Sequence, residues 1–494
     1  MSNPLLFKGC HHQSNWLRLL IRTGTTALSF CLVACAVGPD FQAPAPPETK
    51  NYLPAEKKTS IGDHDDALFS TQMALSAEWW ELFESKELNQ LVQVALVKNP
   101  GLAQANATLK ASQENVLAGQ GVFFPQANLG VSKETLRTAP ITANSPAPSA
   151  LFTLSTLTGT VGYAFDFFGL QRRTVEELEA QSNNQRNLTR AAYLSLEANL
   201  VNTLIARSSY QLLIRHTQSL IAAQTEQMHL AKTAVQAGIT PFSDVLSLTE
   251  ALATNHANLS NLQQKRDQTE HLLASLLGTE TANLSLPDLP LEQLHLAQTL
   301  PLSLPTELVQ QRPDILSAQE QMHIESAAVG VATAMMFPSF SLSASYGSAA
   351  NSFSGLSKNA EHFWNIGPSL NLPLFEGGAQ WHGKESAKQN LLASQAAYRQ
   401  TVLNAFAQVA DCLTALSHDS VLLQTQSRAL EAAQRNDQLA EVNYRAGLLS
   451  YSERLNLKIQ RDLAEMAYWQ VVAQRHQDTV ALLIALGGGW WNPH

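Results

Sequence analysis

The sequence is poor in cysteine, in charged residues and in long apolar runs, and each shortage excludes a class of protein. Its 494 residues include four cysteines, Cys10, Cys31, Cys35 and Cys412. Removal of an N-terminal signal ending at residue 34 would leave Cys412 with no partner for a disulfide within the processed chain, apart from a modified Cys35. Charged residues make up 15% of the chain and the formal net charge is −9, which opposes binding to nucleic acid.

Sequence motifs that carry catalysis or hold a cofactor are missing as well. The sequence contains no His-Glu-x-x-His pattern, and His11 and His12 lie in the N-terminal segment that we expect to be removed. Three glycines, Gly487 to Gly489, precede Trp490 rather than the Lys-Ser/Thr of a phosphate-binding loop, so we predict that they end a helix. We therefore predict that the protein is not an enzyme and holds neither a metal nor a cofactor.

Residues 1–34 have the pattern of an export signal. A basic part precedes a short apolar run, 27–34, which is far below the roughly 20 residues of a membrane-spanning helix. The run ends in Ala34-Cys35, which resembles the bacterial lipobox, in which the cysteine receives diacylglycerol and an N-acyl chain. Ala36 at the next position favours sorting to the outer membrane. The alternative is a cysteine that follows an apolar run by chance.

Glycine and proline are absent from two very long stretches of the chain. Leu170 to Ala237 gives 68 residues without either, and Lys384 to Ala446 gives 63. Each stretch is followed by a glycine, Gly238 or Gly447, and these two glycines are 209 residues apart. Such self-similarity at a fixed offset indicates an internal repeat.

We interpret the repeat as two copies of a long helical hairpin, 170–278 and 379–487, each turning at its glycine. At about 1.5 Å per residue, a helix of this length spans roughly 100 Å, which suits a protein that bridges a distance. A disordered tract is the alternative, but the hydrophobic content of 45% argues against it.

Four short segments have a different period, with apolar and polar residues in alternation. A soluble sandwich would bury the apolar face, whereas a membrane sheet would turn it to lipid. Four strands cannot close a barrel, which needs about eight, and open strand edges are not tolerated in lipid. The membrane interpretation therefore requires strands from several chains in one barrel. The predicted strands are residues about 126–133, 157–168, 339–346 and 363–375.

The remaining boundaries follow from composition. A proline-rich leader precedes Trp79, and shorter helical patterns occur near 86–119, with a break at Pro100, and near 307–336. We expect these shorter helices to stack end to end with the shorter arms of the hairpins. The predicted segments are a signal 1–34, an extended lipidated leader 35–78, a first repeat 79–278, an inter-repeat region 279–305, a second repeat 306–487 and a tail 488–494.

An ordered set of short motifs resembles the TolC-like outer-membrane factors (outer membrane efflux proteins), in particular the lipoprotein branch similar to OprM and NodT. The resemblance covers nearly the whole chain after the signal. The motifs are Cys35 with Val37-Gly38-Pro39-Asp40-Phe41, Trp79-Trp80-Glu81-Leu82-Phe83, Phe165-Asp166-Phe167-Phe168-Gly169, Leu304-Pro305, Gln311-Arg312-Pro313-Asp314-Ile315, Phe337-Pro338, Gly367-Pro368-Ser369-Leu370, Pro373-Leu374-Phe375-Glu376-Gly377-Gly378, Tyr444-Arg445-Ala446-Gly447-Leu448 and Ala485-Leu486-Gly487-Gly488-Gly489-Trp490.

The resemblance implies a mainly helical homotrimer in the outer membrane. Four strands from each chain would form a 12-stranded transmembrane barrel, continued by a periplasmic barrel of helices, with residues 279–305 in a belt around it. Such a protein is a passive duct for small molecules such as drugs and toxic compounds. A periplasmic adaptor and an inner-membrane pump, often of the resistance-nodulation-division type, deliver them. The exported compounds cannot be read from the sequence.

The resemblance also implies two kinds of functional residue. The turns of the two hairpins would dock to the adaptor, although residues that merely turn a helix would look the same. Similar channels often carry an acidic residue nine positions after the second turn glycine, where this chain has Asn456, with Ser452 one helical turn earlier. We expect these two side chains to face the bore as a hydrogen-bonded or adaptor-controlled constriction. The docking residues would be Gly238, Ile239, Thr240, Gly447, Leu448 and Leu449.

Overall fold

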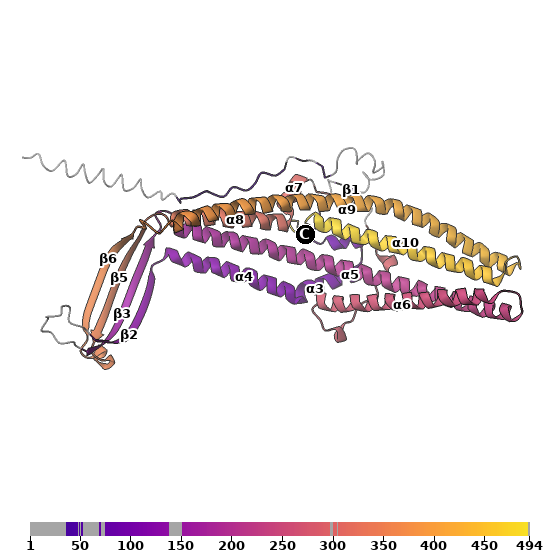
Figure 1. Cartoon of the computed structure of the whole chain (residues 1–494), viewed down its shortest axis with the longest axis horizontal. Coiled ribbons are helices and arrows are strands. Elements are labelled where there is room, and N and C mark those ends of the chain that lie inside the picture. The colour runs from indigo at the N-terminus through magenta and orange to yellow at the C-terminus, as the bar shows by residue number, and fades with distance from the viewer. Residues whose placement is uncertain are drawn as a thin grey trace, which may run out of the picture. The chain divides into compact units, whose positions relative to one another are not determined.

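The computed structural model describes residues 36–47, 49, 51–52, 69–70, 75–137, 151–296, 300–303 and 305–492 (Figure 1). Cys35 and the predicted export signal lie outside these ranges. No helix in the described ranges is both long enough and apolar enough to cross a membrane. The helices are α3 (Lys86–Lys98), α4 (Pro100–Gln120), α5 (Leu170–Gln236), α6 (Phe242–Leu276), α7 (Pro305–Gln311), α8 (Pro313–Ala334), α9 (Ala379–Arg445) and α10 (Tyr451–Ala485). The strands are β1 (Phe69–Ser70), β2 (Gln126–Arg137), β3 (Leu151–Phe165), β4 (Leu300–Pro301), β5 (Ser339–Ala350) and β6 (Glu361–Asn371).

These elements form two compact units, each assembled from three stretches of the chain. The first unit holds Met1–Gln42, Ser112–Ser182 and Gln321–Gln395. The second unit holds Ala43–Ala111, Asn183–Glu320 and Ala396–His494. Because the stretches alternate along the chain, neither unit corresponds to one sequence repeat.

The helical hairpins confirm the repeat in the sequence. Helices α5 and α9 have 67 residues each, and α6 and α10 have 35 residues each. All four helices begin and end at positions that are 209 residues apart in the two copies. The internal duplication therefore fixes the length of each arm as well as the position of each turn.

The shorter helices also stack end to end with the short arms in the second unit. The Asn99 side chain donates to the Leu276 carbonyl at 2.9 Å and accepts from the Leu102 amide at 3.1 Å, so it joins α6 to α4. In the second copy, the Arg312 guanidinium donates to the Ala485 carbonyl at 2.8 Å and so joins α10 to α8. Each junction precedes a proline at the first helical position, where a missing N–H costs nothing.

The glycine run after α10 ends the helix, as predicted. The Gly488 amide donates to the Leu483 carbonyl at 3.0 Å, and Gly487 has a φ of 100°. The Trp490 indole then donates to the Gln311 carbonyl at 2.8 Å. The Trp490 ring packs against Arg190, whose guanidinium carbon lies 3.8 Å from the centroid of the indole. The predicted tail is thus an ordered part of the second unit up to residue 492.

The buried core of the second unit gathers large side chains from α3, α5, α6, α7 and α8 and from the segments that precede them. The Trp79–Phe83 segment is a 3₁₀ helix with Trp79, Trp80 and Phe83 buried. The predicted inter-repeat region contributes Leu289 and Leu291. The side chains under 2% exposed are Trp79, Phe83, Leu88, Leu200, Leu204, Ile205, Leu212, Leu273, Leu289, Leu291, Leu308 and Ile315.

The first unit contains a four-stranded antiparallel sheet in the order β2-β3-β5-β6 (Figure 1). All four predicted strands are present. A second, two-stranded parallel sheet of β1 and β4 belongs to the other unit.

The predicted strand ends were wrong in two respects. The strands were predicted to end at about 133 and 346 and to resume at about 157, but β2 continues to Arg137, β3 starts at Leu151 and β5 continues to Ala350. Cross-strand pairing recruits these polar residues; for example, the Thr135 and Thr153 hydroxyls lie 3.2 Å apart. In the other direction, β3 and β6 end before the predicted 168 and 375. Asp166 turns away to bind the start of α5, and β6 ends at Asn371, two residues before Pro373, which has no N–H to donate.

Candidate functional site

The two hairpin turns have the same backbone geometry. Gly238 and Gly447 have φ values of 71° and 72°, in the left-handed region that disfavours every residue with a Cβ. The Gly238 amide donates to the Val235 carbonyl at 3.0 Å, and the Ile239 amide donates to the Ala234 carbonyl at 2.9 Å. These two bonds define the Schellman motif, which satisfies the last carbonyls of a helix.

The second turn repeats this pattern, and both turns present an apolar side chain to solvent. The Leu448 amide donates to the Asn443 carbonyl at 2.8 Å. In the single chain, Ile239 is 76% exposed and Leu448 is 78% exposed. Thr240 and Leu449 are half-buried. Exposed apolar side chains at both turns are compatible with a surface that a partner covers, and docking at these six residues stays a prediction.

The predicted constriction residues lie in the first turns of α10. Ser452 and Asn456 are both exposed in the single chain, and they are four residues apart on one helix face. The Asn456 side-chain oxygen accepts a hydrogen bond from the Gln227 amide of α5 at 2.5 Å, a contact that sequence reasoning missed. That these side chains face a bore stays a prediction.

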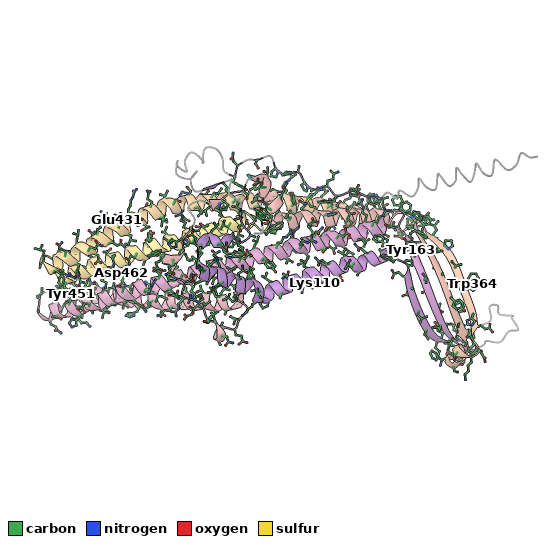
Figure 2. The ribbon with its side chains drawn as sticks, turned by 180° about the vertical axis from the view of Figure 1, so that it is seen from behind. Lys110, Tyr163, Trp364, Glu431, Tyr451 and Asp462 are labelled. Carbon is green, nitrogen blue, oxygen red and sulfur yellow. The ribbon has the colours of Figure 1, made fainter. Side chains whose placement is uncertain are left out.

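Helices α5 and α10 meet along a seam that is apolar near the turn and polar further along. The apolar part consists of Leu220, Ala223, Leu455 and Ile459, with Leu230 and Tyr451 packed against it. Beyond it, the Ser219 hydroxyl donates to the Asp462 carboxylate at 2.7 Å. Figure 2 shows Tyr451 and Asp462 on the same arm. The seam joins one hairpin to the other.

The polar part of the seam continues onto α9. Arg461 bridges the Asp437 and Asp462 carboxylates at 2.6 and 2.9 Å. Burial raises the pKa of Asp462, but the nearby His216 ring and the hydrogen bonds from Ser219 and Arg461 outweigh it and lower the pKa to about 2. In the sequence, this cluster could be recognised only from the spacing of Arg461, Asp462 and Glu465 along one helix. Its other members, on α5 and α9, are distant in the sequence.

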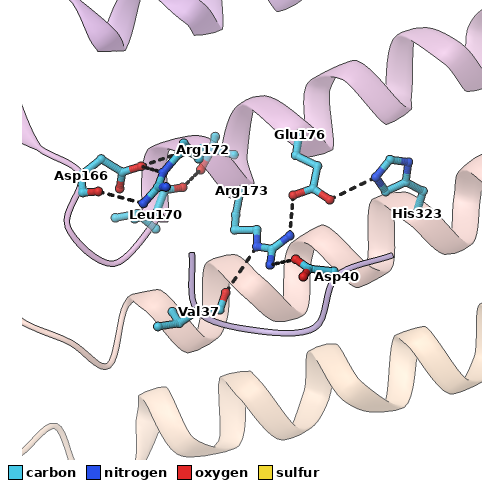
Figure 3. A network of polar contacts seen from close by, with 9 residues as sticks. Val37, Asp40, Asp166, Leu170, Arg172, Arg173, Glu176 and His323 are labelled. Carbon is cyan, nitrogen blue, oxygen red and sulfur yellow. Dashed lines mark hydrogen bonds and ion pairs between the residues drawn. The ribbon is translucent and has the colours of Figure 1, made fainter. Parts of the chain in front are cut away.

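In the first unit, the leader is held by a buried arginine (Figure 3). The side chain of Arg173, on α5, is 4% exposed. It donates to the Asp40 carboxylate at 2.6 Å, to the Val37 carbonyl at 3.3 Å and to the Glu176 carboxylate at 2.7 Å. The other Glu176 oxygen lies 3.1 Å from the His323 ring nitrogen. The motif at residues 37–41, which begins two residues after Cys35 in the sequence, therefore attaches the leader to α5.

Two further contacts fix the position of the leader. The Phe41 ring stacks on the His323 ring with centroids 4.4 Å apart. A Cβ at Gly38 would lie 2.6 Å from the Gly330 Cα, so only glycine allows this approach of the two backbones. These contacts place residue 36 beside the start of α5, where the Val37 amide donates to the Phe168 carbonyl at 3.1 Å.

The motif at residues 165–169 starts α5. The Asp166 carboxylate accepts hydrogen bonds from the Gln171 and Arg172 amides, both at 3.0 Å, and from the Arg172 guanidinium at 3.1 Å (Figure 3). A carboxylate at this helix end satisfies free N–H groups and complements the helix dipole. The motif at residues 165–169 can therefore be explained by its role at the start of α5.

The four-stranded sheet has one apolar and one polar face, as its register requires. On the apolar face, Phe165 pairs with Phe340 near one end, and Tyr346 pairs with Trp364 near the other. Figure 2 shows Trp364 on β6. Two successive rows across this face are Ala127, Val161, Ala344 and Ile366, and Leu129, Gly159, Tyr346 and Trp364. The row between them, on the opposite face, is Asn128, Thr160, Ser345 and Asn365.

Most of the large residues on the apolar face are exposed in the single chain, among them Leu129, Val161 and Ile366. Aromatic residues at the two ends of an apolar band are typical of a sheet that crosses a lipid bilayer. Duplicated long helical hairpins and a small sheet of this kind together define the TolC-like outer-membrane channels as the class of protein.

Comparison with known proteins identifies the family. The sequence model of the outer membrane efflux protein family matches residues 91–279 and 304–488, and the chain belongs to this family. Nodulation protein T of Rhizobium leguminosarum bv. viciae is 28% identical over 484 residues, which cover 96% of this chain and 94% of that protein. The antibiotic efflux pump outer membrane protein ArpC of Pseudomonas putida is 28% identical over 466 residues, 94% of each chain.

The fold agrees with a solved structure of the same kind. The outer-membrane channel OprN superposes with a TM-score of 0.79 at 28% identity, over 92% of this chain and 100% of that one. The predicted family and mainly helical fold class are therefore confirmed.

Proposed function

We propose that this chain is the outer-membrane duct of a three-part export assembly, in which three copies close their sheets into one 12-stranded barrel. The four-stranded sheet carries the proposal. Within the described residues, β2 and β6 each pair along one side only. Unpaired strand edges are not tolerated in lipid, so an apolar sheet of four strands needs strands from further copies.

The polar face of the sheet suits a water-filled bore. The Ser345 hydroxyl donates to the Asn365 side chain at 3.0 Å, and the Ser341 and Ser369 hydroxyls lie 2.7 Å apart. Each of these side chains forms a hydrogen bond to a neighbour on the sheet, and its remaining donors and acceptors can bind water. In this proposal the duct is passive: the side chains of the polar face provide a lining for water and solutes and do not take part in a reaction.

The family and the exposed turns support the partners that we propose. A periplasmic adaptor would cover Ile239 and Leu448, and an inner-membrane pump, of the resistance-nodulation-division type, would supply the energy. Acyl chains on Cys35 would hold the leader at the inner surface of the outer membrane. The similarity to an antibiotic efflux protein favours drugs and toxic small molecules as the cargo.

A matched pair of arginine substitutions tests the membrane face. Val161 and Thr160 are neighbours on β3 that belong to opposite faces. An arginine on a lipid-facing position in mid-membrane costs about 2–4 kcal/mol, but one in the bore does not. We expect Val161→Arg to lower the yield of trimers in the outer membrane, whereas Thr160→Arg inserts normally and changes the ion selectivity of the pore.

The measurements are the mass of the purified complex in detergent and its conductance in planar bilayers. The wild type should have the mass of three chains and give stepwise currents. A monomer without conductance would indicate a structural envelope lipoprotein and overturn the proposal, as would equal effects of the two arginines on insertion.

A further inference from the structure

Three metal-binding side chains converge where α5 meets α10 in the second unit. The His216 ring nitrogen Nδ1 lies 3.1 Å from a Glu465 carboxylate oxygen and 3.9 Å from an Asp462 carboxylate oxygen. All three ligand atoms lie within 4.8 Å of one another. Asp462 and Glu465 are three residues apart on α10, so they share a helix face, and His216 reaches them from α5.

Neighbouring groups hold the carboxylates in this orientation. The Ser219 hydroxyl donates to Asp462 Oδ2, which leaves Oδ1 toward His216. The Gln434 amide of α9 lies 3.5 Å from Glu465 Oε1, which leaves Oε2 toward His216. Such secondary hydrogen bonds orient ligands at metal sites and raise affinity. Asp462 is 1% exposed as a side chain, so the site is partly dehydrated in advance.

The charges around the three side chains do not cancel. Three carboxylates, those of Asp437, Asp462 and Glu465, contact a single guanidinium, that of Arg461. With a neutral imidazole the cluster therefore carries a net charge of −2, which one divalent cation would neutralise. Arg461 donates to the Asp462 oxygen that faces His216, and a second lone pair on that oxygen remains for a cation.

We propose that His216, Asp462 and Glu465 form a binding site for one divalent transition-metal ion per chain, with Zn²⁺ as the first candidate. One imidazole nitrogen and two carboxylate oxygens are ligands that Zn²⁺ takes at about 2.0–2.2 Å. This ligand set excludes Ca²⁺ and Mg²⁺ as preferred ions, since both favour oxygen ligands alone. The nearby guanidinium weakens the site relative to a structural zinc site.

A bound ion would connect the two hairpins. His216 belongs to the long arm of the first hairpin, and the two carboxylates belong to the short arm of the second. Any separation of α5 from α10 would have to break metal–ligand bonds as well as the seam of Leu220 and Leu455. The proposed site thereby ties the spacing of these two helices to the concentration of free metal.

The experiment is a titration of the full-length protein, without a polyhistidine tag, in detergent. Co²⁺ absorption in the visible range and calorimetry with Zn²⁺ report ligation and stoichiometry. We expect one ion per chain at the site, and a loss of affinity of at least about tenfold in His216→Ala and Glu465→Gln. The matched control is His229→Ala, an exposed histidine on the same helix, which should bind as the wild type does.

A thermal measurement makes the outcome decisive. Zn²⁺ should also raise the unfolding temperature of the wild type more than that of His216→Ala, and circular dichroism checks that the variant is folded. Equal stoichiometry and affinity in His216→Ala and His229→Ala would overturn the proposal and leave an ion pair only. Metal binding is measured separately from conductance, so neither outcome of this experiment supports or contradicts the proposed function as a duct.

Discussion

A buried glutamate in the core of the second unit should make the protein less stable as the pH rises. Glu197 is 6% exposed, and its carboxylate accepts a hydrogen bond from the Trp79 indole at 3.0 Å. Burial raises the pKa of Glu197 from 4.5 to about 8, and the Trp79 hydrogen bond offsets only part of this. The folded side chain therefore keeps its proton at neutral pH, whereas the unfolded chain releases it.

The sign and the size of the effect follow from proton linkage. Between pH 4.5 and 8 the folded state binds more protons than the unfolded state, so the free energy of unfolding falls as the pH rises through this window. At 1.36 kcal/mol for each pH unit, the loss between pH 4.5 and pH 7 is about 3 kcal/mol. A glutamine would keep an acceptor for Trp79 and remove the ionisation.

We therefore expect Glu197→Gln to be more stable than the wild type at pH 8 and close to it at pH 4.5. Thermal unfolding followed by circular dichroism in one detergent measures this, with an expected gain of several degrees at pH 8. The exposed Glu226 of the same helix gives the control, Glu226→Gln, which should keep the wild-type pH dependence. A Glu197→Gln protein that loses stability with pH as steeply as the wild type would refute the reasoning.

Two further predictions concern the leader and the constriction. Arg173→Ala removes two contacts to the leader, the hydrogen bonds to the Asp40 carboxylate and the Val37 carbonyl. Because the Asp40 side chain is 88% exposed, each is worth about 1 kcal/mol, and proteases should cleave the leader at least about tenfold faster than in the exposed control Arg186→Ala. An unchanged cleavage rate would show that Arg173 does not hold the leader. Asn456→Asp introduces a carboxylate at the proposed constriction, so its single-channel conductance should depend more strongly on the cation. Unchanged conductance and selectivity would place Asn456 outside the bore.

Local sequence signals predicted the helices and turns well. The runs without glycine or proline and the 209-residue offset were sufficient for the four long helices, because a helix depends on contacts three and four residues away. The turn glycines Gly238 and Gly447 could be identified for the same reason, since the left-handed conformation is a property of one residue.

Strand ends were predicted less well, because they depend on the partner strand. Thr135 looks like a loop residue in a segment rich in threonine and proline, yet Thr153 pairs with it and extends the ladder. The same limit applies to the candidate metal site, which differs from the expectation that the protein holds no metal. His216 and Asp462 are 246 residues apart in the sequence, and no local spacing pattern connects them.

The sequence by itself determined the duplication, the helix lengths, the turns and the alternation of apolar and polar residues along the strands, since each depends on residues close together in the chain. Only the tertiary structure decided which side chains meet across helices: Gln227 with Asn456, His216 with Glu465 and Arg173 with Asp40. These pairs depend on how long helices and an extended leader pack, and a repeat of 3.6 residues leaves several alignments of two such helices equally compatible with the pattern.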